Sequence, residues 1–209
     1  MGEYFIARHG QSEWNAIRRI QGQANTSLSQ LGRQQSQSLH QALGDQPLTA
    51  IFTSSLDRTI QTAQPLADHL QVPVQQTALL NELDFGSLVG KYLMELDQKD
   101  QQIWDWWMAD PVRREIPGGE SYQDLRKRIL VFMDDLSLIP GKESILIVGH
   151  LRVNQVLLGC LTGLTLQESI YIRQPNNWLY HFRPDSQIRG GKIPSVPGEQ
   201  IRWQPGLLI

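Results

Sequence analysis

The 209-residue sequence has a single cysteine, Cys160, which excludes a disulfide within one chain. It has no run of about 18 consecutive apolar residues, and its amino-terminal residues lack the cationic segment, apolar stretch and cleavage site of a secretory signal. A formal net charge of only −2 argues against general binding to nucleic acid or to a membrane surface. These absences predict a soluble cytoplasmic protein that has neither of those partners.

The apolar content of 40% is enough for a sizeable core, and 209 residues lie within the range of one α/β domain. We therefore expect a single domain over residues 1–209. Residues 86–119 form the least regular part of the pattern and are expected to be a lid insertion. The spacing of Val153, Val156, Leu157 and Leu161 places Cys160 on the buried stripe of a helix.

Short apolar runs alternate with amphipathic segments along the chain. Strands are predicted at residues 4–7, 50–53 and 145–148, within 72–80, and at the sheet edge at 178–183 and 201–203. Helices are predicted from Ser29 to about Leu43, from Ser54 or Ser55 with a bend at Pro65, and from Ser121 with Asp124 in its first turn. Residues 11–28 and 184–198 are predicted as loops. This alternation predicts a three-layer α/β/α sandwich with a mainly parallel central sheet.

Two of the five histidines directly follow predicted strands. Arg8-His9-Gly10 comes after the first apolar run, and Gly149-His150 comes after the run at 145–148. In an open α/β sheet, ligands bind where strands end. A single histidine there is usually an ordinary surface or core residue, but packing alone gives no reason for two strands to end in this way.

Arginines near these histidines indicate phosphoryl chemistry. Arg58 falls in the first turn of a predicted helix, where its guanidinium adds to the positive helix end, and Arg8 supplies a second forked donor. An arginine at either position alone could instead be a solvated surface residue. Neighbouring arginines disfavour the cationic form of histidine, so a neutral His9 is the predicted nucleophile toward phosphorus.

A proton donor is needed for the departing alkoxide, and Glu82 is the best candidate. It follows Leu79-Leu80, which we interpret as another strand end above the same pocket. Asp84 is a weaker alternative. From spacing alone, a catalytic role for Glu82 is only modestly favoured over the interpretation of Glu82 as an ordinary solvated carboxylate.

A series of motifs resembles the histidine phosphatase superfamily, also called the phosphoglycerate mutase-like family. The motifs, in order, are Arg8-His9-Gly10-Gln11-Ser12-Glu13-Trp14-Asn15, Arg19-Ile20-Gln21-Gly22-Gln23, Leu28-Ser29-Gln30-Leu31-Gly32, Ser55-Leu56-Asp57-Arg58-Thr59-Ile60-Gln61-Thr62-Ala63, Asn81-Glu82-Leu83-Asp84-Phe85-Gly86, Pro117-Gly118-Gly119-Glu120-Ser121 and Val148-Gly149-His150. They span most of residues 4–160. Such an ordered string is far more specific than Arg-His-Gly alone, and it implies a phosphoglycerate mutase-like fold.

The resemblance also implies roles for individual residues. His9 would become transiently phosphorylated, Arg8, Arg58 and His150 would hold the phosphoryl group, and Glu82 would donate a proton and later activate water. Asn15, Gln21 and Gly22 match phosphate- or substrate-contacting positions, and Ser12 either adds a hydroxyl contact or shapes its loop. The expected partner is a small phosphorylated metabolite. No cofactor and no metal are implied, and a homodimer is left open as the assembly.

Two positions depart from the family pattern. Leu151 stands where the family often has glycine after its second histidine, and leucine would resist a positive φ angle if the site required one. Leu88-Val89-Gly90 replaces the common Trp-Glu-Gly, which puts the conformation of the lid in question.

Three functions are compatible with these motifs. A cofactor-independent phosphomonoesterase is favoured over a phosphoglycerate mutase, because classical mutases of the family are longer and carry insertions in the region of residues 86–119. The pair Arg113-Arg114 favours the mutase if it faces the site, and is a solvated turn otherwise. A silent phosphometabolite-binding protein would not need Glu82. Trp104, Trp106 and Trp107 are interpreted as lid packing, with a ligand-stacking platform as the alternative.

Overall fold

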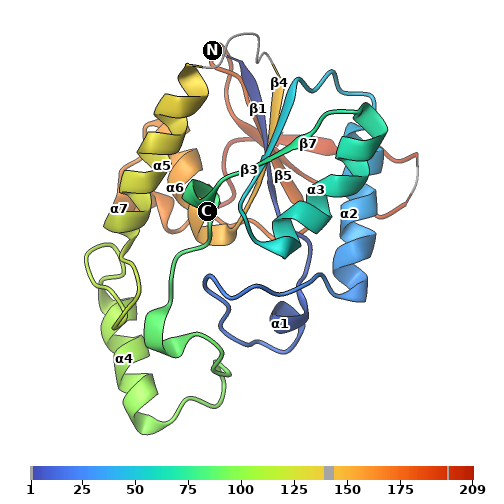
Figure 1. Ribbon diagram of the computed structural model, residues 1–209. Coiled ribbons are helices and arrows are strands. Elements are labelled where there is room, and N and C mark those ends of the chain that lie inside the picture. Colours follow the sequence, from blue (N-terminus) through green and yellow to red (C-terminus); the bar gives the residue numbers. More distant parts are fainter. Residues whose placement is uncertain (1, 139–143, 197) are drawn as a thin grey trace.

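The computed structural model describes residues 2–138, 144–196 and 198–209, and within them one sheet of seven strands forms the centre of the molecule (Figure 1). The strands are β1 (Glu3–Arg8), β2 (Ala50–Thr53), β3 (Val74–Gln76), β4 (Ser144–Gly149), β5 (Trp178–Phe182), β6 (Arg189–Lys192) and β7 (Arg202–Pro205). Their order is β3-β2-β4-β1-β5-β6-β7; β1 to β4 pair in parallel, and β5 to β7 continue the sheet antiparallel.

Helices cover both faces of the sheet, which confirms the predicted three layers. In Figure 1, α2 (Gln30–Leu43) and α3 (Asp57–Leu70) lie on one side and α5 (Tyr122–Ser137), α6 (Leu151–Thr162) and the short α7 (Leu166–Ser169) lie on the other. The short α1 (Glu13–Ala16) and α4 (Gln98–Ala109) lie near the carboxyl ends of the parallel strands. None of the described helices is long and apolar enough to cross a membrane.

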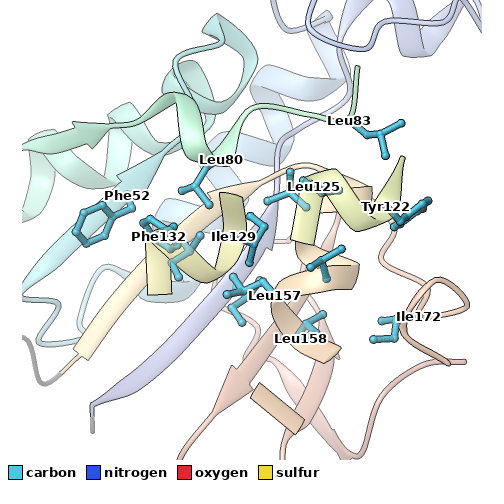
Figure 2. Packing of buried hydrophobic residues seen from close by; sticks show 14 of the residues in the cluster. Phe52, Leu80, Leu83, Tyr122, Leu125, Ile129, Phe132, Leu157, Leu158 and Ile172 are labelled. Atoms are coloured by element: carbon cyan, nitrogen blue, oxygen red, sulfur yellow. The ribbon is translucent and has the colours of Figure 1, made fainter. Parts of the chain in front are cut away.

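The alternation of side chains along β1 divides the core in two. Phe5 and Ala7 pack with the buried residues of α2 and α3, whereas Tyr4 and Ile6 pack in the cluster that includes α5 and α6. Figure 2 shows part of this second cluster, where Phe132 of α5 lies against Phe52 of β2 with ring centroids 5.6 Å apart. Because both faces of β1 are buried, its register and its carboxyl end are fixed firmly.

The helix starts agree with the sequence at two places and differ at a third. Ser29 caps α2 through the amide of Gly32, and Ser121 caps α5 with Asp124 in a reciprocal box. Neither Ser54 nor Ser55 caps α3, whose first flanking residue is Leu56. The helix continues through Pro65. Cys160 is half-buried at the edge of the core on α6.

Three segments predicted as irregular contain regular structure. The predicted loop 11–28 contains the four-residue helix α1, which Ser12 caps through the amide of Asn15. Strand β6 lies inside the predicted loop 184–198, of which residue 197 falls outside the described residues. Glycine is common in loops, but a side chain at Gly190 would collide with Trp178 Nε1 at 2.6 Å, so this glycine allows close packing of β6 on β5. In the 86–119 segment, a 3₁₀ turn at Gly86–Leu88 precedes the 12-residue α4.

Candidate active site

The two strand-end histidines meet at one edge of the sheet. Strands β1 and β4 are neighbours in parallel register, with Arg8 opposite Gly149. The amide of His9 donates to the carbonyl of Gly149 at 3.0 Å, and the ring centroids of His9 and His150 are 5.1 Å apart. The convergence that the sequence pattern predicted is therefore present.

Local contacts fix the tautomer of His9. Its Nδ1 lies 2.7 Å from the carbonyl oxygen of Gly10, and since that oxygen only accepts, Nδ1 carries the hydrogen and Nε2 keeps its lone pair. Burial, followed by the charges of Arg58 and Arg8, holds the pKa of His9 well below its usual value. The imidazole is therefore neutral near pH 7, with Nε2 free to act as a nucleophile.

The backbone around His9 is held from three directions. Asn176 Nδ2 donates to the carbonyl of His9 at 2.6 Å, and the amide of Gly10 donates to Thr62 Oγ1 at 2.9 Å. Position 10 must be glycine, because a Cβ atom there would lie 2.5 Å from the carbonyl oxygen of Gly32. The strand end thus meets α2 and α3 at van der Waals distance, which leaves the His9 backbone little freedom.

Two arginines stand beside His9, of which Arg58 is buried and Arg8 is half-buried. Arg58, in the first turn of α3, donates to the carbonyls of Gly22 and Ala24, each at 2.8 Å. Arg8 donates to the carbonyl of Gln174 at 3.1 Å. Burial is the main cause that lowers the pKa of each arginine to about 10, so both remain cationic at neutral pH. Their fixed guanidinium groups suit the planar recognition of phosphoryl oxygens.

His150 lies deeper than His9. Its Nε2 is 2.8 Å from Ser54 Oγ, and burial, followed by the charge of Arg58, holds its pKa well below the usual value. Among the described residues, Nε of Arg8, Nε of Arg58 and Nδ1 of His150 are buried without a hydrogen-bond partner. Unpartnered buried polar atoms are unusual, and a cluster of them around one histidine fits a site that receives a polar ligand.

Glu82 reaches this pocket from a loop and not from a strand end. Strand β3 ends at Gln76, and a 3₁₀ turn (Ala78–Leu80) intervenes, so the interpretation of Glu82 as a strand-end residue is wrong. The residue is 7% exposed, and its Oε1 accepts from the amide of Leu83 at 2.9 Å. Asp84, the weaker alternative, binds the amide of Gly86 instead and does not line the pocket.

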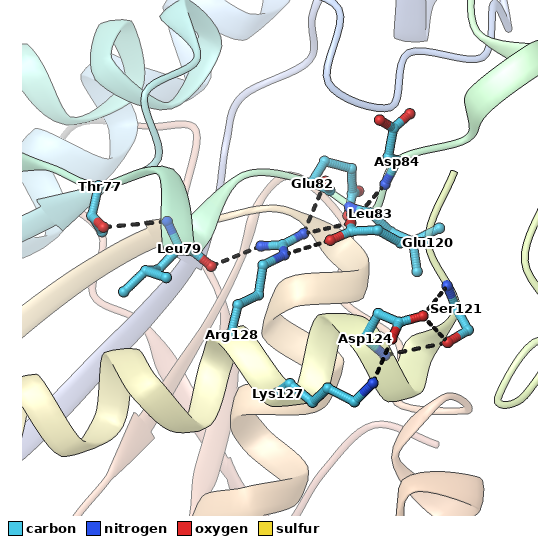
Figure 3. Close-up of polar contacts among 10 residues, drawn as sticks. All are labelled: Thr77, Leu79, Glu82, Leu83, Asp84, Glu120, Ser121, Asp124, Lys127 and Arg128. Atoms are coloured by element: carbon cyan, nitrogen blue, oxygen red, sulfur yellow. Dashed lines mark hydrogen bonds and ion pairs between the residues drawn. The ribbon is translucent and has the colours of Figure 1, made fainter. Parts of the chain in front are cut away.

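Arg128 of α5 fixes the Glu82 loop from below (Figure 3). Its guanidinium makes two 2.9 Å bonds to the carboxylate of Glu120, and it also donates to the carbonyls of Leu79 at 2.7 Å and Glu82 at 3.1 Å. Glu120 in turn accepts from the amide of Asp84 at 3.0 Å. This network ties the loop on both sides of Glu82 to a core helix.

The pocket over His9 has a volume of about 220 Å³. It is lined by Arg8, His9, Asn15, Arg18, Arg19, Ile20, Gln21, Gly22, Arg58, Glu82, Phe85, Leu93, Trp104 and Arg152. The predicted residues Asn15, Gln21 and Gly22 are present. Ser12 is buried beneath them, where its hydroxyl donates to Gln21 Oε1 at 2.7 Å, so it shapes the loop. A second hollow, of about 1050 Å³, lies beside Glu3, Pro47 and Thr49, and none of the predicted site residues lines it.

The arginine pair of the predicted lid lies outside the pocket. Arg113 is exposed and pairs with Asp110 at 3.2 Å, and Arg114 donates to the carbonyl of Trp106. The structure therefore places both arginines in a polar turn. Arg152, which sequence reasoning missed, lines the pocket instead. Its only sequence signal was its place two residues after His150.

The tryptophans of α4 pack against Phe85 of the neighbouring loop. Trp107 is 2% exposed, with its ring centroid 5.4 Å from that of Phe85. Trp104 stacks on the same ring, so the interpretation as packing is confirmed for it, and it also forms part of the pocket wall. Trp106 is exposed and lies beneath Arg114.

The two departures from the family pattern are accommodated. Leu151 is the first residue of α6, and among the described residues only Arg18 and Gln71 combine a positive φ with a side chain, so the expected strain at Leu151 is absent. Leu88 is buried, and the amide of Gly90 donates to the carbonyl of Ile20 at 2.8 Å. The segment thus braces the loop that forms one side of the pocket. Nowhere in the described chain do three or more His, Cys, Asp or Glu side chains form a group suited to a metal ion.

The sequence model of the histidine phosphatase superfamily (branch 1) matches residues 4–189. The chain belongs to this superfamily. A curated relative, the probable phosphoglycerate mutase GpmB of Yersinia enterocolitica, is 34% identical over 164 residues, covering 78% of this chain and 76% of the relative. The relative of the same name from Serratia proteamaculans is 34% identical over 167 residues, covering 79% and 75%.

Solved structures of phosphatases share the fold of this superfamily member. The alpha-ribazole phosphatase from Shigella flexneri superposes with a TM-score of 0.81 at 28% identity, over 87% of this chain and 90% of that one. A mycobacterial glucosyl-3-phosphoglycerate phosphatase gives a TM-score of 0.76 at 24% identity, over 99% and 98%, and this likeness concerns the fold alone. The family and fold expected from the motifs are confirmed.

Proposed function

We propose that this histidine phosphatase superfamily member is a phosphomonoesterase that hydrolyses a small phosphorylated metabolite through a phosphohistidine on His9. The observation that carries the proposal is the state of His9: it is neutral, its Nδ1 hydrogen is donated to the carbonyl of Gly10, and the cationic Arg58 and Arg8 lie near it. A nucleophile of this kind needs its free nitrogen and nearby positive charge at the same time. The pocket of about 220 Å³ suits a small ester.

In the first half of the proposed reaction, Nε2 of His9 forms a bond to phosphorus as the bond from phosphorus to the leaving oxygen breaks. Arg8 and Arg58 stabilise the charge on the phosphoryl oxygens, and Glu82 gives its proton to the leaving oxygen. In the second half, water attacks phosphorus and passes a proton to Glu82 while the nitrogen–phosphorus bond breaks. Free phosphate, neutral His9 and protonated Glu82 result.

A phosphoglycerate mutase is the second candidate, because the curated relatives carry that name. A mutase must exclude water and return the phosphoryl group to another hydroxyl of the substrate. Against it stands the position of Arg113 and Arg114, which both lie outside the pocket. A silent binding protein is disfavoured, because binding alone requires neither the free Nε2 of His9 nor a carboxylic acid at Glu82.

The test is the release of inorganic phosphate by the wild-type protein and by His9→Ala, with a chelator present, from phosphoglycerates, sugar phosphates, nucleotides and an aryl phosphate. With a substrate that carries a labelled phosphoryl group, rapid quenching without acid should trap a labelled protein. The label should be lost in acid, as expected for a phosphohistidine. Interconversion of 2- and 3-phosphoglycerate without phosphate release would favour the mutase. Binding without turnover by either route would favour the silent protein.

A further inference from the structure

The pocket over His9 carries more positive charge than a single phosphoryl group requires. Five arginines line it, and Glu82 is the only acidic residue among the described lining residues, so its net charge is +4 when Glu82 is ionised. A phosphomonoester brings a charge of about −2 near neutral pH. Arg8 and Arg58 act on His9 and match that charge, so with Glu82 ionised a positive charge of about +2 remains on the side of Arg18, Arg19 and Arg152.

Of these three arginines, Arg152 lies closest to His150 along the chain, and it is half-buried. It occupies the second position of α6 and lies with its guanidinium carbon 5.3 Å from the centroid of the Phe85 ring. Its charge helps to lower the pKa of Arg8, after the larger effect of burial, so the two cations act on each other across the pocket. Within the described part of the chain, Arg152 forms no ion pair with a carboxylate; its polar contact there is the neutral hydroxyl of Tyr122.

The other two arginines differ in how far their side chains are already engaged. Arg19 stacks on Trp14 at 4.0 Å and donates to the carbonyl of Gly90, so it serves to hold the loop. Arg18 is exposed at the mouth and has a left-handed backbone with φ of 54°.

We propose that Arg152 forms a subsite for a second oxyanion on the substrate, a carboxylate or a second phosphoryl group. The inference rests on the proposed phosphomonoesterase function and names its substrate class as a phosphomonoester with a further anionic group. A half-buried guanidinium beside another cation is unfavourable unless an anion compensates it, and its fork matches two oxygens of a carboxylate or phosphate. Phe85 and Trp104 form the apolar wall along which the carbon skeleton lies.

The test compares esters that differ in one group. 3-Phosphoglycerate and glycerol 3-phosphate differ by a carboxylate in place of a hydroxymethyl group, and fructose 1,6-bisphosphate and fructose 6-phosphate differ by a phosphoryl group. In each pair the wild-type protein should prefer the more anionic ester by about tenfold or more in kcat/KM, the size expected of a charge-assisted contact. The pair that shows the preference identifies the oxyanion.

Arg152→Gln should reduce this preference by about tenfold, mainly through a raised KM for the more anionic ester, and Arg152→Lys should restore part of it. Arg113→Gln is the matched control, because it removes an exposed arginine outside the pocket and should leave the preference unchanged. A wild-type protein without a preference in either pair would overturn the inference, as would equal losses by Arg152→Gln on both members of a pair. Unfolding midpoints of the variants separate these results from a damaged fold.

Binding measurements keep this inference distinct from the proposed hydrolysis. Calorimetric titration of His9→Ala with 3-phosphoglycerate and glycerol 3-phosphate, with and without Arg152→Gln, measures the same preference where no turnover occurs. A preference that depends on Arg152 would support the subsite even if the wild-type protein released no phosphate. Equal affinities for the two ligands would refute the carboxylate form, and the fructose phosphate pair then decides the phosphoryl form.

Discussion

Removing Arg128 should destabilise the protein and also misplace Glu82. Arg128→Met keeps most of the apolar stem and deletes the donors that bind Glu120 and the carbonyls of Leu79 and Glu82. The side chains of Arg128 and Glu120 are only 15% and 22% exposed, so water replaces the lost partners incompletely. Breaking a buried pair costs about 3–5 kcal/mol, and partial access to water brings our expectation to about 3 kcal/mol.

The matched control is Lys127→Met, one residue away on the same helix. Lys127 pairs with Asp124 at 2.7 Å (Figure 3). Its side chain is 77% exposed. Such a surface pair contributes under about 1 kcal/mol. Urea unfolding should therefore show a loss for Arg128→Met that is several times larger, and thermal unfolding should show a decrease of about 6–12 °C for a chain of this size.

Kinetics test whether Arg128 also positions Glu82. Displacement of the Glu82 carboxylic acid should slow the hydrolysis of glycerol 3-phosphate much more than that of p-nitrophenyl phosphate, because a phenolate needs less protonation to leave. The double variant Arg128→Met/Glu120→Gln should be less destabilised than the sum of its single variants, since each single change leaves a charge without its partner. Equal stability losses in Arg128→Met and Lys127→Met would refute the energetic reasoning, and equal slowing of both esters would refute the positioning role.

Three further predictions concern the residues around His9. Glu82→Gln should reduce kcat for alkyl phosphates far more than for aryl phosphates, and a uniform loss would remove Glu82 from the role of general acid. The folded-state pKa values of His9 and His150 lie well below 6.5, so the unfolded chain binds protons first as the pH falls below about 6.5. The free energy of unfolding should then decrease by up to about 1.4 kcal/mol per pH unit for each histidine. Urea unfolding at pH 7 and 5.5 should show a smaller decrease in this free energy for His9→Asn than for the wild-type protein. Gly10→Ala should cost about 1–3 kcal/mol in unfolding experiments and should lower turnover, because its Cβ would displace the strand end from Gly32; unaltered activity would show that the contact yields easily.

The sequence determined those features that depend on local pattern. The continuous apolar run at positions 4–7 predicted a buried strand, and Ser29 and Ser121 predicted helix starts through their side-chain hydrogen bonds. The positions of His9 and His150 at strand ends predicted their meeting, because parallel strands present the same ends at one edge of a sheet. The ordered motifs then predicted the superfamily.

Only the tertiary structure decided the features that depend on contacts distant along the chain. Gly190 and Gly191 gave a loop signal, although Gly190 fits under Trp178 in a strand. Nothing near Glu82 in the sequence indicates that Arg128, 46 positions later, holds its backbone. Arg152 enters the pocket because α6 begins directly after His150 and turns this side chain toward Phe85. The charge of a pocket is the sum over side chains that come from distant parts of the chain. The sequence therefore specified each arginine, but only the tertiary structure decided which of them share one pocket.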